Sequence, residues 1–173
     1  MTPVSLLQAL IATPSQSRHE DATADILFDE MSARGLQPSR IANNVYAVAP
    51  GYDPSRPTLL LNSHHDTVPP SKSYTRDPYK PTLTEGRLYG LGSNDAGASG
   101  VALLEAFTRV RNQQLPFNLI IALTAEEEVG GENGMRLFLP HILGEGYRID
   151  AAIVGEPTGM QAAVGERGLV VFD

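Results

Sequence analysis

The segment 59–69 constrains the fold of this 173-residue chain more than any other part of the sequence. It reads LLLNS and then passes directly into His64, His65 and Asp66. Consecutive apolar residues predict a strand that is covered on both faces. Because side chains alternate along a strand, His64 and Asp66 are expected on the same side. An imidazole with a carboxylate beside it is typical of a metal-binding site. We therefore expect the other residues of such a site near this strand end.

The remaining chain alternates between strand-like and helix-like segments. Further strands are expected at 44–48, 117–124, 151–154, 161–165 and 169–172, with a hairpin formed by 82–84 and 87–89. Helices are expected at 4–11, around 22–31, at 98–110 and at 133–139, the last one interrupted by Pro140. Ser17 and Glu20 have the spacing of a capping box before the second helix. This alternation predicts an α/β domain, a three-layer sandwich whose helices flank a mostly parallel central sheet.

The composition argues against several classes of partner. The net charge is -7 and the pI is about 5.0, which argues against nucleic-acid binding. No apolar run approaches the ~18 residues of a membrane span, and the first residues carry no basic segment typical of a secretory signal. The chain has no cysteine, which excludes disulfides and thiolate metal sites. We therefore expect a cytoplasmic protein that binds neither nucleic acid nor membrane.

Metal-ligating residue types follow three of the expected strands. They are His64 with Asp66, the triplet Glu126–Glu128, and Glu156, and Asp95 joins them from a glycine-rich turn before a helix. Ligands of open α/β sheets bind at the carboxyl ends of the strands. So many carboxylates at one edge would repel each other unless a cation lay among them. One imidazole with several carboxylates favours zinc, cobalt or manganese over calcium.

Each of these residues also has a purely structural interpretation. A histidine at a strand end can serve only as a hydrogen-bonding group, and Asp95 can cap the following helix. The glutamate triplet can form a solvated turn, and Glu156 can belong to an ordinary strand-to-turn junction. Their joint placement at one sheet edge favours a site. The neighbours Glu127 and Glu128 then suggest divided roles, one ligating a metal and the other moving protons.

Four motifs carry a resemblance to a known family. They are Ser63–Pro69, Tyr89–Asp95, Thr124–Glu128 and Val154–Thr158. From Ser5 to Asp173 the chain resembles the dinuclear zinc exopeptidase and amidohydrolase family. Its members include acetylornithine deacetylase, succinyl-diaminopimelate desuccinylase, aminoacylase and glutamate carboxypeptidase. The segments 74–79 and 86–92 look most like acetylornithine deacetylase.

The resemblance implies a role for each candidate residue. Asp95 would bridge two zinc ions, which cobalt or manganese can replace. In the implied assignment the first metal is completed by His64 and Glu156, the second is held by Glu128, Glu127 is the general base, and Asp66 orients His64. The peptide bond after Asp95 is expected to be cis.

This chain also departs from the family pattern. Family members are roughly twice as long, with a second, smaller domain and a later histidine ligand for the second metal. His141 does not match that histidine by motif. We expect residues 1–165 to be the N-terminal part of the catalytic domain and 166–173 to begin a lid and dimerisation domain. By itself the chain is expected to bind at most one metal tightly and to be nearly inactive, while the full-length protein would be a homodimer.

The implied reaction is metal-dependent hydrolysis of a small N-acyl amino acid. The resemblance favours N-acetylornithine, which yields ornithine and acetate in arginine biosynthesis. A desuccinylase or a dipeptidase of the same family is the close alternative. A non-catalytic domain that kept the fold is the alternative from another class, and the presence of Glu127 argues against it.

Overall fold

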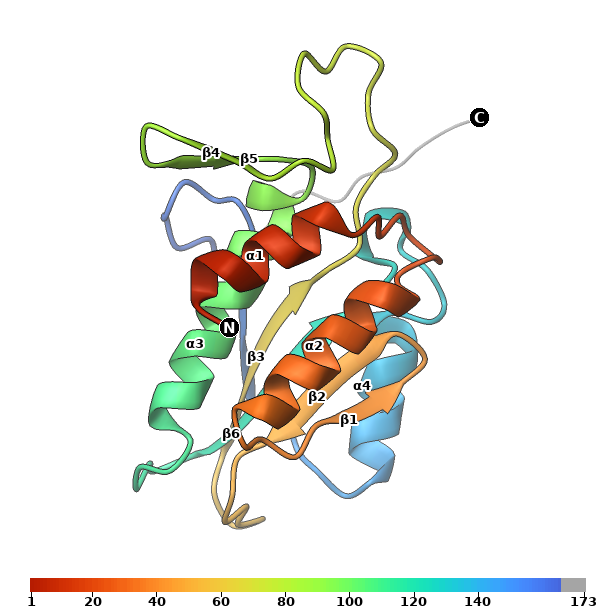
Figure 1. The fold of residues 1–173 in the computed structure, drawn as a ribbon. Coiled ribbons are helices and arrows are strands. Elements are labelled where there is room, and N and C mark those ends of the chain that lie inside the picture. Colours follow the sequence, from red (N-terminus) through yellow and green to blue (C-terminus); the bar gives the residue numbers. More distant parts are fainter. Residues whose placement is uncertain (166–173) are drawn as a thin grey trace.

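A computed structural model describes residues 1–165 and contains a five-stranded sheet and a separate hairpin (Figure 1). The helices are α1 (Pro3–Ala12), α2 (Asp21–Ala33), α3 (Ala98–Val110) and α4 (Met135–Gly144), with short helical turns at Ser93–Gly97 and Glu127–Val129. The strands are β1 (Ser39–Ile41), β2 (Asn44–Val48), β3 (Thr58–His64), β4 (Thr82–Thr84), β5 (Arg87–Tyr89), β6 (Asn118–Thr124) and β7 (Ala151–Val154). Among the described residues, no helix combines the length and the apolar character needed to cross a membrane.

The five-stranded sheet is mixed, in the order β1-β2-β6-β3-β7. Strand β3 pairs in parallel with both β6 and β7, whereas β2 runs antiparallel to β6 and to β1. Strand β1 was not expected from the sequence. Only Ala42 and Asn43 separate it from β2, and so short a connection permits only an antiparallel pair. The three adjacent strands β6, β3 and β7 therefore end at one edge, as the sequence predicted.

Helices cover both faces of the sheet, which confirms the three-layer α/β fold. One layer consists of α1, α2 and α3, which pack on Leu119, Ile121 and Leu123 of β6. The other layer is α4, whose Phe138 and Ile142 pack with Tyr46, Leu60, Ile120 and Ala122. Alternate side chains of β6 thus enter opposite cores, as expected of a fully buried central strand. Figure 1 shows the three helices on the near face and α4 behind the sheet.

The register of the parallel strands determines which residues meet at the carboxyl edge. His64 of β3 lies opposite Thr124 of β6, and Asn62 lies opposite Val154 of β7. The glutamates that follow Thr124 and the glutamate at 156 therefore emerge beside His64. The hairpin of β4 and β5, and the long connection 69–81 that precedes it, lie beyond this same edge (Figure 1).

The predicted interruption of the last helix at Pro140 is wrong. Helix α4 continues through Pro140 to Gly144. Pro140 is exposed, while Phe138 and Ile142 on the opposite side are fully buried. An interior proline costs about 3 kcal/mol, and burying two large apolar side chains contributes a similar amount or more, at about 1.5–3 kcal/mol each. Packing therefore outweighs the lost backbone hydrogen bond.

The predicted capping box before α2 is also wrong. Glu20 occupies the N-cap position but makes no side-chain capping bond, and the Ser17 hydroxyl donates to Asp66 Oδ2 at 2.7 Å. An ionised carboxylate is a stronger acceptor than any group the helix offers. Both side chains therefore turn away from the helix and toward the carboxyl edge of the sheet.

The C-terminal strand expected at 161–165 is absent. These residues are exposed and unpaired in the described part of the chain, and Val164 has no neighbour to pack against. A strand needs a partner for its hydrogen bonds, and none of residues 1–165 provides one here. The strand expected at 169–172 and the domain expected to begin at 166 lie outside the described residues.

Candidate metal centre

The imidazole of His64 forms the floor of the candidate site. His64 is the last residue of β3 and is buried, with Nδ1 lying 3.0 Å from the main-chain oxygen of Asp66. The Asp66 carboxylate also lies 3.3 Å from Nδ1. Two acceptors at Nδ1 favour the tautomer that carries its proton there. The lone pair of Nε2 is then directed toward the open edge, in the arrangement a metal-ligating histidine requires.

Three carboxylates surround His64 Nε2. Asp95 Oδ1 lies 3.1 Å away, and an oxygen of Glu127 and one of Glu156 each lie 3.8 Å away. The imidazole is 1% exposed, whereas the Asp95 and Glu127 side chains are each 54% exposed. The acids therefore close over the imidazole from the solvent side. The structure thus brings together residues from three separate strand ends and one loop.

His64, Asp95 and Glu128 have the spacing of ligands around one ion. Each offers one donor atom, and these atoms all lie within 4.8 Å of one another. Donor atoms that each lie about 2.0–2.3 Å from one metal ion would be separated from one another by distances comparable to those observed among these three residues. Glu156 is outside this set, although its carboxylate approaches His64 Nε2. The donor atoms fit a divalent metal, and how they would be divided between two metals stays a prediction.

The electrostatics of the cluster favour an added cation. Burial lowers the pKa of His64, but the hydrogen bond and charge of Asp66 and the charges of Glu156 and Glu127 outweigh it and raise that pKa to about 9. Burial, followed by the charges of neighbouring carboxylates, raises the pKa of Glu128 and also that of Glu156. Without a metal, a proton is therefore held where a cation would otherwise lie.

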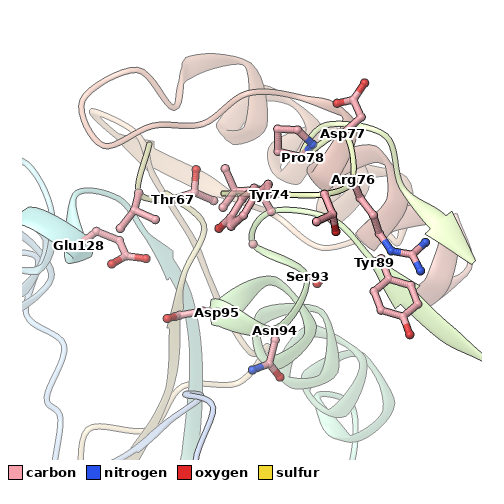
Figure 2. A pocket seen from close by; sticks show the side chains of 15 residues that line it. Thr67, Tyr74, Arg76, Asp77, Pro78, Tyr89, Ser93, Asn94, Asp95 and Glu128 are labelled. Carbon is pink, nitrogen blue, oxygen red and sulfur yellow. The ribbon is translucent and has the colours of Figure 1, made fainter. Parts of the chain in front are cut away.

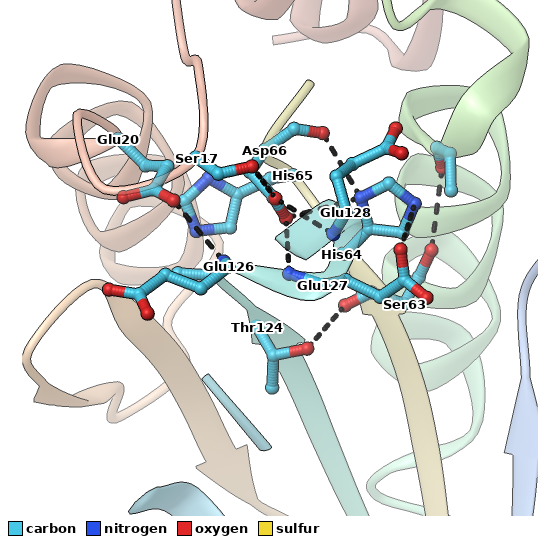
Figure 3. A network of polar contacts seen from close by, with 12 residues as sticks. Ser17, Glu20, Ser63, His64, His65, Asp66, Thr124, Glu126, Glu127 and Glu128 are labelled. Atoms are coloured by element: carbon cyan, nitrogen blue, oxygen red, sulfur yellow. Dashed lines mark hydrogen bonds and ion pairs between the residues drawn. The ribbon is translucent and has the colours of Figure 1, made fainter. Parts of the chain in front are cut away.

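The Asp66 carboxylate connects the imidazole to the glutamate loop (Figure 3). Oδ1 accepts the main-chain N–H of Glu127 at 3.1 Å, and Oδ2 accepts that of Glu128 at 3.2 Å. Burial raises the pKa of Asp66, but the hydrogen bonds from His64, Ser17 and the Glu127 N–H lower it below its ordinary value. Asp66 therefore stays ionised and fixes the position of His64 relative to the two glutamates.

Asp95 and Glu156 reach the site from turns, and hydrogen bonds fix the turn beside Glu156. The peptide bond between Asp95 and Ala96 is cis, as the resemblance implied. Beside Glu156, the N–H of Gly155 donates to Asn62 O and the Ser63 hydroxyl donates to Gly155 O, both at 2.8 Å. A Cβ atom on Gly155 would lie 2.9 Å from the Cβ atom of Ser99 in α3, so this close approach favours glycine.

Two other histidines take no part in the cluster. His65 is buried between Thr23 Oγ1 and the main-chain oxygen of Asn43, each 2.9 Å from one ring nitrogen. His141 contacts the hydroxyl of Tyr46 on the α4 side of the sheet. The sequence motif likewise did not assign His141 as a ligand.

A cleft of about 550 Å³ begins at the cluster. Figure 2 shows Glu128 and Asp95 at one end of this cleft and Arg76 with Tyr89 at the other. The guanidinium carbon of Arg76 lies 4.2 Å from the centre of the Tyr89 ring. Among the described residues, no carboxylate forms an ion pair with Arg76. The cleft therefore combines an acidic end with a cation that forms no ion pair within residues 1–165.

Two residues that hold the glutamate loop in place were not expected from the sequence. Asn44 at the start of β2 and Glu20 before α2 both bind the loop that carries Glu127 and Glu128. An asparagine that opens a strand gives no signal of such a contact. For Glu20 the sequence does contain a signal, its spacing from Ser17. The capping-box interpretation assigned that spacing to the start of α2 and not to the glutamate loop.

The described residues form a mixed α/β sheet whose parallel strands end in one imidazole and several carboxylates, an α/β domain with donor groups suited to a divalent metal. Residues 60–167 match the family model described as Peptidase family M20/M25/M40, and the chain belongs to this family. It is 32% identical to a succinyl-diaminopimelate desuccinylase of Caulobacter sp. strain K31, covering 96% of this chain and 45% of that protein. It is 31% identical to succinyl-diaminopimelate desuccinylase 2 of Ruegeria sp. strain TM1040, covering 97% and 45%.

Solved structures share the fold at lower sequence identity. An M20 family metallo-carboxypeptidase from Sulfolobus solfataricus has a TM-score of 0.74 at 22% identity, covering 90% of this chain and 37% of that one. A dinuclear metal-binding peptidase of the M20 family from Bacillus subtilis has a TM-score of 0.65 at 16% identity, covering 88% and 41%. The chain spans less than half the length of the relatives it matches.

Proposed function

We propose that the protein containing this chain hydrolyses the amide bond of a small N-acyl amino acid with the help of a divalent metal. The observation that carries the proposal is the convergence of His64, Asp95 and Glu128 at one end of a cleft. The names of the desuccinylase relatives support an amide substrate with an amino-acid product. Since the chain spans 45% of those relatives, we also propose that 1–165 is the first part of a catalytic domain.

The protein groups would divide the proton transfers between them. A bound divalent metal would acidify water and polarise the acyl carbonyl. Glu127 projects into the cluster from a loop held by Asp66, and its exposed carboxylate can take a proton from the attacking water. The same carboxylate would then give the proton to the departing amine. Asp66 would keep the proton of His64 on Nδ1 so that Nε2 remains a ligand.

We propose zinc as the resident ion, with cobalt or manganese as substitutes. The donor set of one imidazole and several carboxylates supports this choice, since calcium prefers oxygen donors alone. Within the described residues one three-donor group meets the spacing of a metal site. We therefore expect this chain alone to bind a single zinc ion tightly.

There are two candidate substrates, and different observations favour each of them. The guanidinium of Arg76, which forms no ion pair among the described residues, lies at the far end of the cleft and favours an acyl group that ends in a carboxylate, such as a succinyl group. The names of the relatives also favour a succinylated substrate, N-succinyl-diaminopimelate. The segments 74–79 and 86–92 favour N-acetylornithine through their resemblance to acetylornithine deacetylase. We propose desuccinylation as the main activity and deacetylation as the alternative.

A substrate panel on the natural gene product that contains this chain would test the proposal. The panel would include N-acetylornithine, N-succinyl-diaminopimelate and a set of dipeptides, with Glu127→Ala as the inactive control. Arg76→Gln should raise KM for the succinylated substrate and leave KM for the acetylated one unchanged. Equal effects on both substrates would contradict the role of Arg76, and turnover in Glu127→Ala would contradict the role of Glu127.

A further inference from the structure

The loop that carries the glutamates is held by an unusual set of side-chain contacts. In 125–128, four successive main-chain N–H groups each donate to a side-chain oxygen. The acceptors in order are Asn44 Oδ1 at 3.1 Å, Glu20 Oε1 at 3.2 Å, Asp66 Oδ1 at 3.1 Å and Asp66 Oδ2 at 3.2 Å. We call the side chains of Glu20, Asn44 and Asp66 the amide cradle. Its members come from three separate segments of the chain.

The loop needs these acceptors because its backbone leaves regular structure directly after β6. Glu126 has a φ of +56°, a left-handed conformation that residues other than glycine rarely adopt. Glu126 is also buried, so its N–H cannot be satisfied by water. A strained conformation of this kind persists only when the surroundings fix it. The cradle supplies that constraint immediately before Glu127 and Glu128.

Glu20 is a buried carboxylate whose two oxygens bind three separate segments of the chain, at Arg18, Asn43 and Glu126. Its exposed fraction is 0%, and among the described residues no cation forms an ion pair with it. Its oxygens accept instead from Arg18 N at 2.7 Å, from Asn43 Nδ2 at 3.1 Å and from Glu126 N. A buried charge is tolerated when hydrogen bonds replace its water, and two of these bonds come from main-chain amides. Figure 3 shows Glu20 and Glu126 joined beside His65.

Asn44 holds both ends of the same loop. Its Oδ1 accepts from Ala125 N, and its Nδ2 donates to the main-chain oxygen of Asn133 at 2.6 Å. Asn133 in turn donates from its main-chain N–H and its side chain to the Glu126 carboxylate, at 3.2 Å and 2.8 Å. Asn44 therefore closes the loop 125–133 into a ring of hydrogen bonds, in which the bond from Ala125 N is buried and those of Asn133 are partly buried.

We propose that Glu20 and Asn44 are positioning residues of the metal centre, which act by fixing the backbone of 125–128. They place the side chains of Glu127 and Glu128 against His64, together with Asp66, although neither of them lies in the cluster. This inference rests on the proposed function, because it assigns the loop a metal-binding and proton-transferring role. Small displacements of reacting groups are costly, so a cradle of this kind has a direct effect on chemistry.

The test compares cradle variants with a matched clamp at the other end of β6. Asn118 opens β6, is buried, and holds the loop at Asp53 through the same amide chemistry. The variants are Glu20→Ala, Glu20→Gln and Asn44→Ala, with Asn118→Ala as the control. Zinc affinity is measured by calorimetry and the amides of 125–128 by hydrogen exchange, both on this chain.

Glu20→Ala and Asn44→Ala should weaken zinc binding by about 10- to 100-fold and accelerate exchange at 125–128. Glu20→Gln keeps an oxygen acceptor for the Arg18 and Glu126 N–H groups and loses only the bond from Asn43 Nδ2, so it should recover most of the zinc affinity and of the exchange protection. Asn118→Ala should lower the thermal midpoint without changing zinc affinity. In the natural gene product, Asn44→Ala should lower kcat with KM nearly unchanged. Asn44→Ala, which removes no buried charge, carries the comparison if Glu20→Ala does not fold.

Equal zinc affinity and equal loop exchange in the cradle variants and the wild type would overturn the inference. A loss of affinity in Asn118→Ala as large as in Asn44→Ala would also overturn it, because the effect would then be one of general stability. A wild-type chain that bound no divalent metal would instead overturn the proposed function. The two failures are therefore distinguishable in one set of titrations.

Discussion

The two ends of strand β6 use the same clamp for different purposes. At the amino end, Asn118 accepts from Asp53 N and donates to Asp53 O, both at 2.8 Å, which fixes the preceding loop. At the carboxyl end, Asn44 fixes the loop after Thr124 through an equivalent set of amide contacts. The difference lies in the acids nearby. Asp53 at the amino end has an arginine partner, Arg56, at 3.2 Å.

Among residues 1–165, the acids of the carboxyl end have no arginine or lysine partner. Asp95, Glu127 and Glu156 all face the single imidazole of His64. At the amino end, Asp150 accepts from Thr58 N and from Arg148, so its charge has a partner within the protein. The acids of the structural clamp are thus paired with arginines, whereas the acids of the candidate site keep a negative charge that a bound cation could neutralise. This contrast is the physical reason to place the metal at the carboxyl end.

The largest effect is expected from Glu127→Gln, assayed in the natural gene product. Removing the proton-accepting carboxylate should lower turnover by about 100- to 10,000-fold, the range for general acid–base groups. Stability should hold or rise, because one of the mutually repelling carboxylates is neutralised. Glu132→Gln, an exposed acid in the same loop, is the control and should keep full turnover. Comparable losses in the two variants would show that the loop needs negative charge in general and not a base at 127.

The next largest effect is expected from pH, which should change zinc binding at the carboxyl end. The pKa of His64 without metal is raised to about 9, mainly because Asp66 and its neighbours outweigh the effect of burial. Zinc competes with that proton, so zinc affinity should rise by about tenfold per pH unit up to about pH 9. The stability that protonated His64 gives the metal-free chain is complete below about pH 6.5 and is lost as the pH rises through about 9.

Zinc titrations at fixed ionic strength from pH 6 to 9, with thermal melts of the metal-free chain, would measure both trends. Affinity that is independent of pH across this range would mean that His64 is neutral in the metal-free chain. That result would contradict the account of the electrostatics without removing His64 as a ligand.

Asp66→Asn and Asp150→Asn form a matched pair across the sheet. Asp66→Asn should weaken zinc binding by about 10- to 100-fold, because one carboxylate oxygen becomes an NH2 group, which cannot accept from the main-chain N–H of Glu127 or Glu128. Asp150→Asn should reduce stability by about 1 kcal/mol and leave zinc affinity unchanged. Calorimetry and chemical denaturation of both variants would give the two numbers. A comparable loss of zinc affinity in Asp150→Asn would erase the distinction between the ends.

The smallest effect is expected from Ser17→Ala. The Ser17 hydroxyl donates to Asp66 Oδ2 and does not cap α2, so its loss should weaken zinc binding by about fivefold and spare the helix. Ser5→Ala, which removes a hydroxyl near the start of α1, is the matched control and should leave zinc affinity unchanged. Hydrogen exchange in the first turn of α2 would report on the helix. Faster exchange there with unchanged zinc affinity would restore the capping interpretation.

Much of the site followed from the sequence because strand direction and register are regular. An apolar run ending in His64, and two more ending before Glu126 and Glu156, sufficed to place these residues at one edge. Parallel pairing makes that inference general, since carboxyl ends of neighbouring parallel strands always meet. The cis peptide after Asp95 came only from the family resemblance.

The parts that could not be predicted depend on competition between distant groups. Ser17 and Glu20 match a local helix cap, and only the fold shows that Asp66 and the Glu126 amide outweigh it. Pro140 was expected to break a helix, but buried neighbours on one face maintain it. In both cases a local rule lost to tertiary contacts that no short window of sequence contains.

The most direct test of the central claim is a calorimetric zinc titration of the metal-free chain and of Asp95→Asn. Asp95 lies closest of the acids to His64 Nε2, and its side chain is exposed enough for the substitution to leave the fold intact. We expect a single tight zinc site in the wild type and its loss in Asp95→Asn, with unchanged circular dichroism. A wild-type chain without a tight site, or an Asp95→Asn variant that binds zinc as tightly as the wild type, would contradict it.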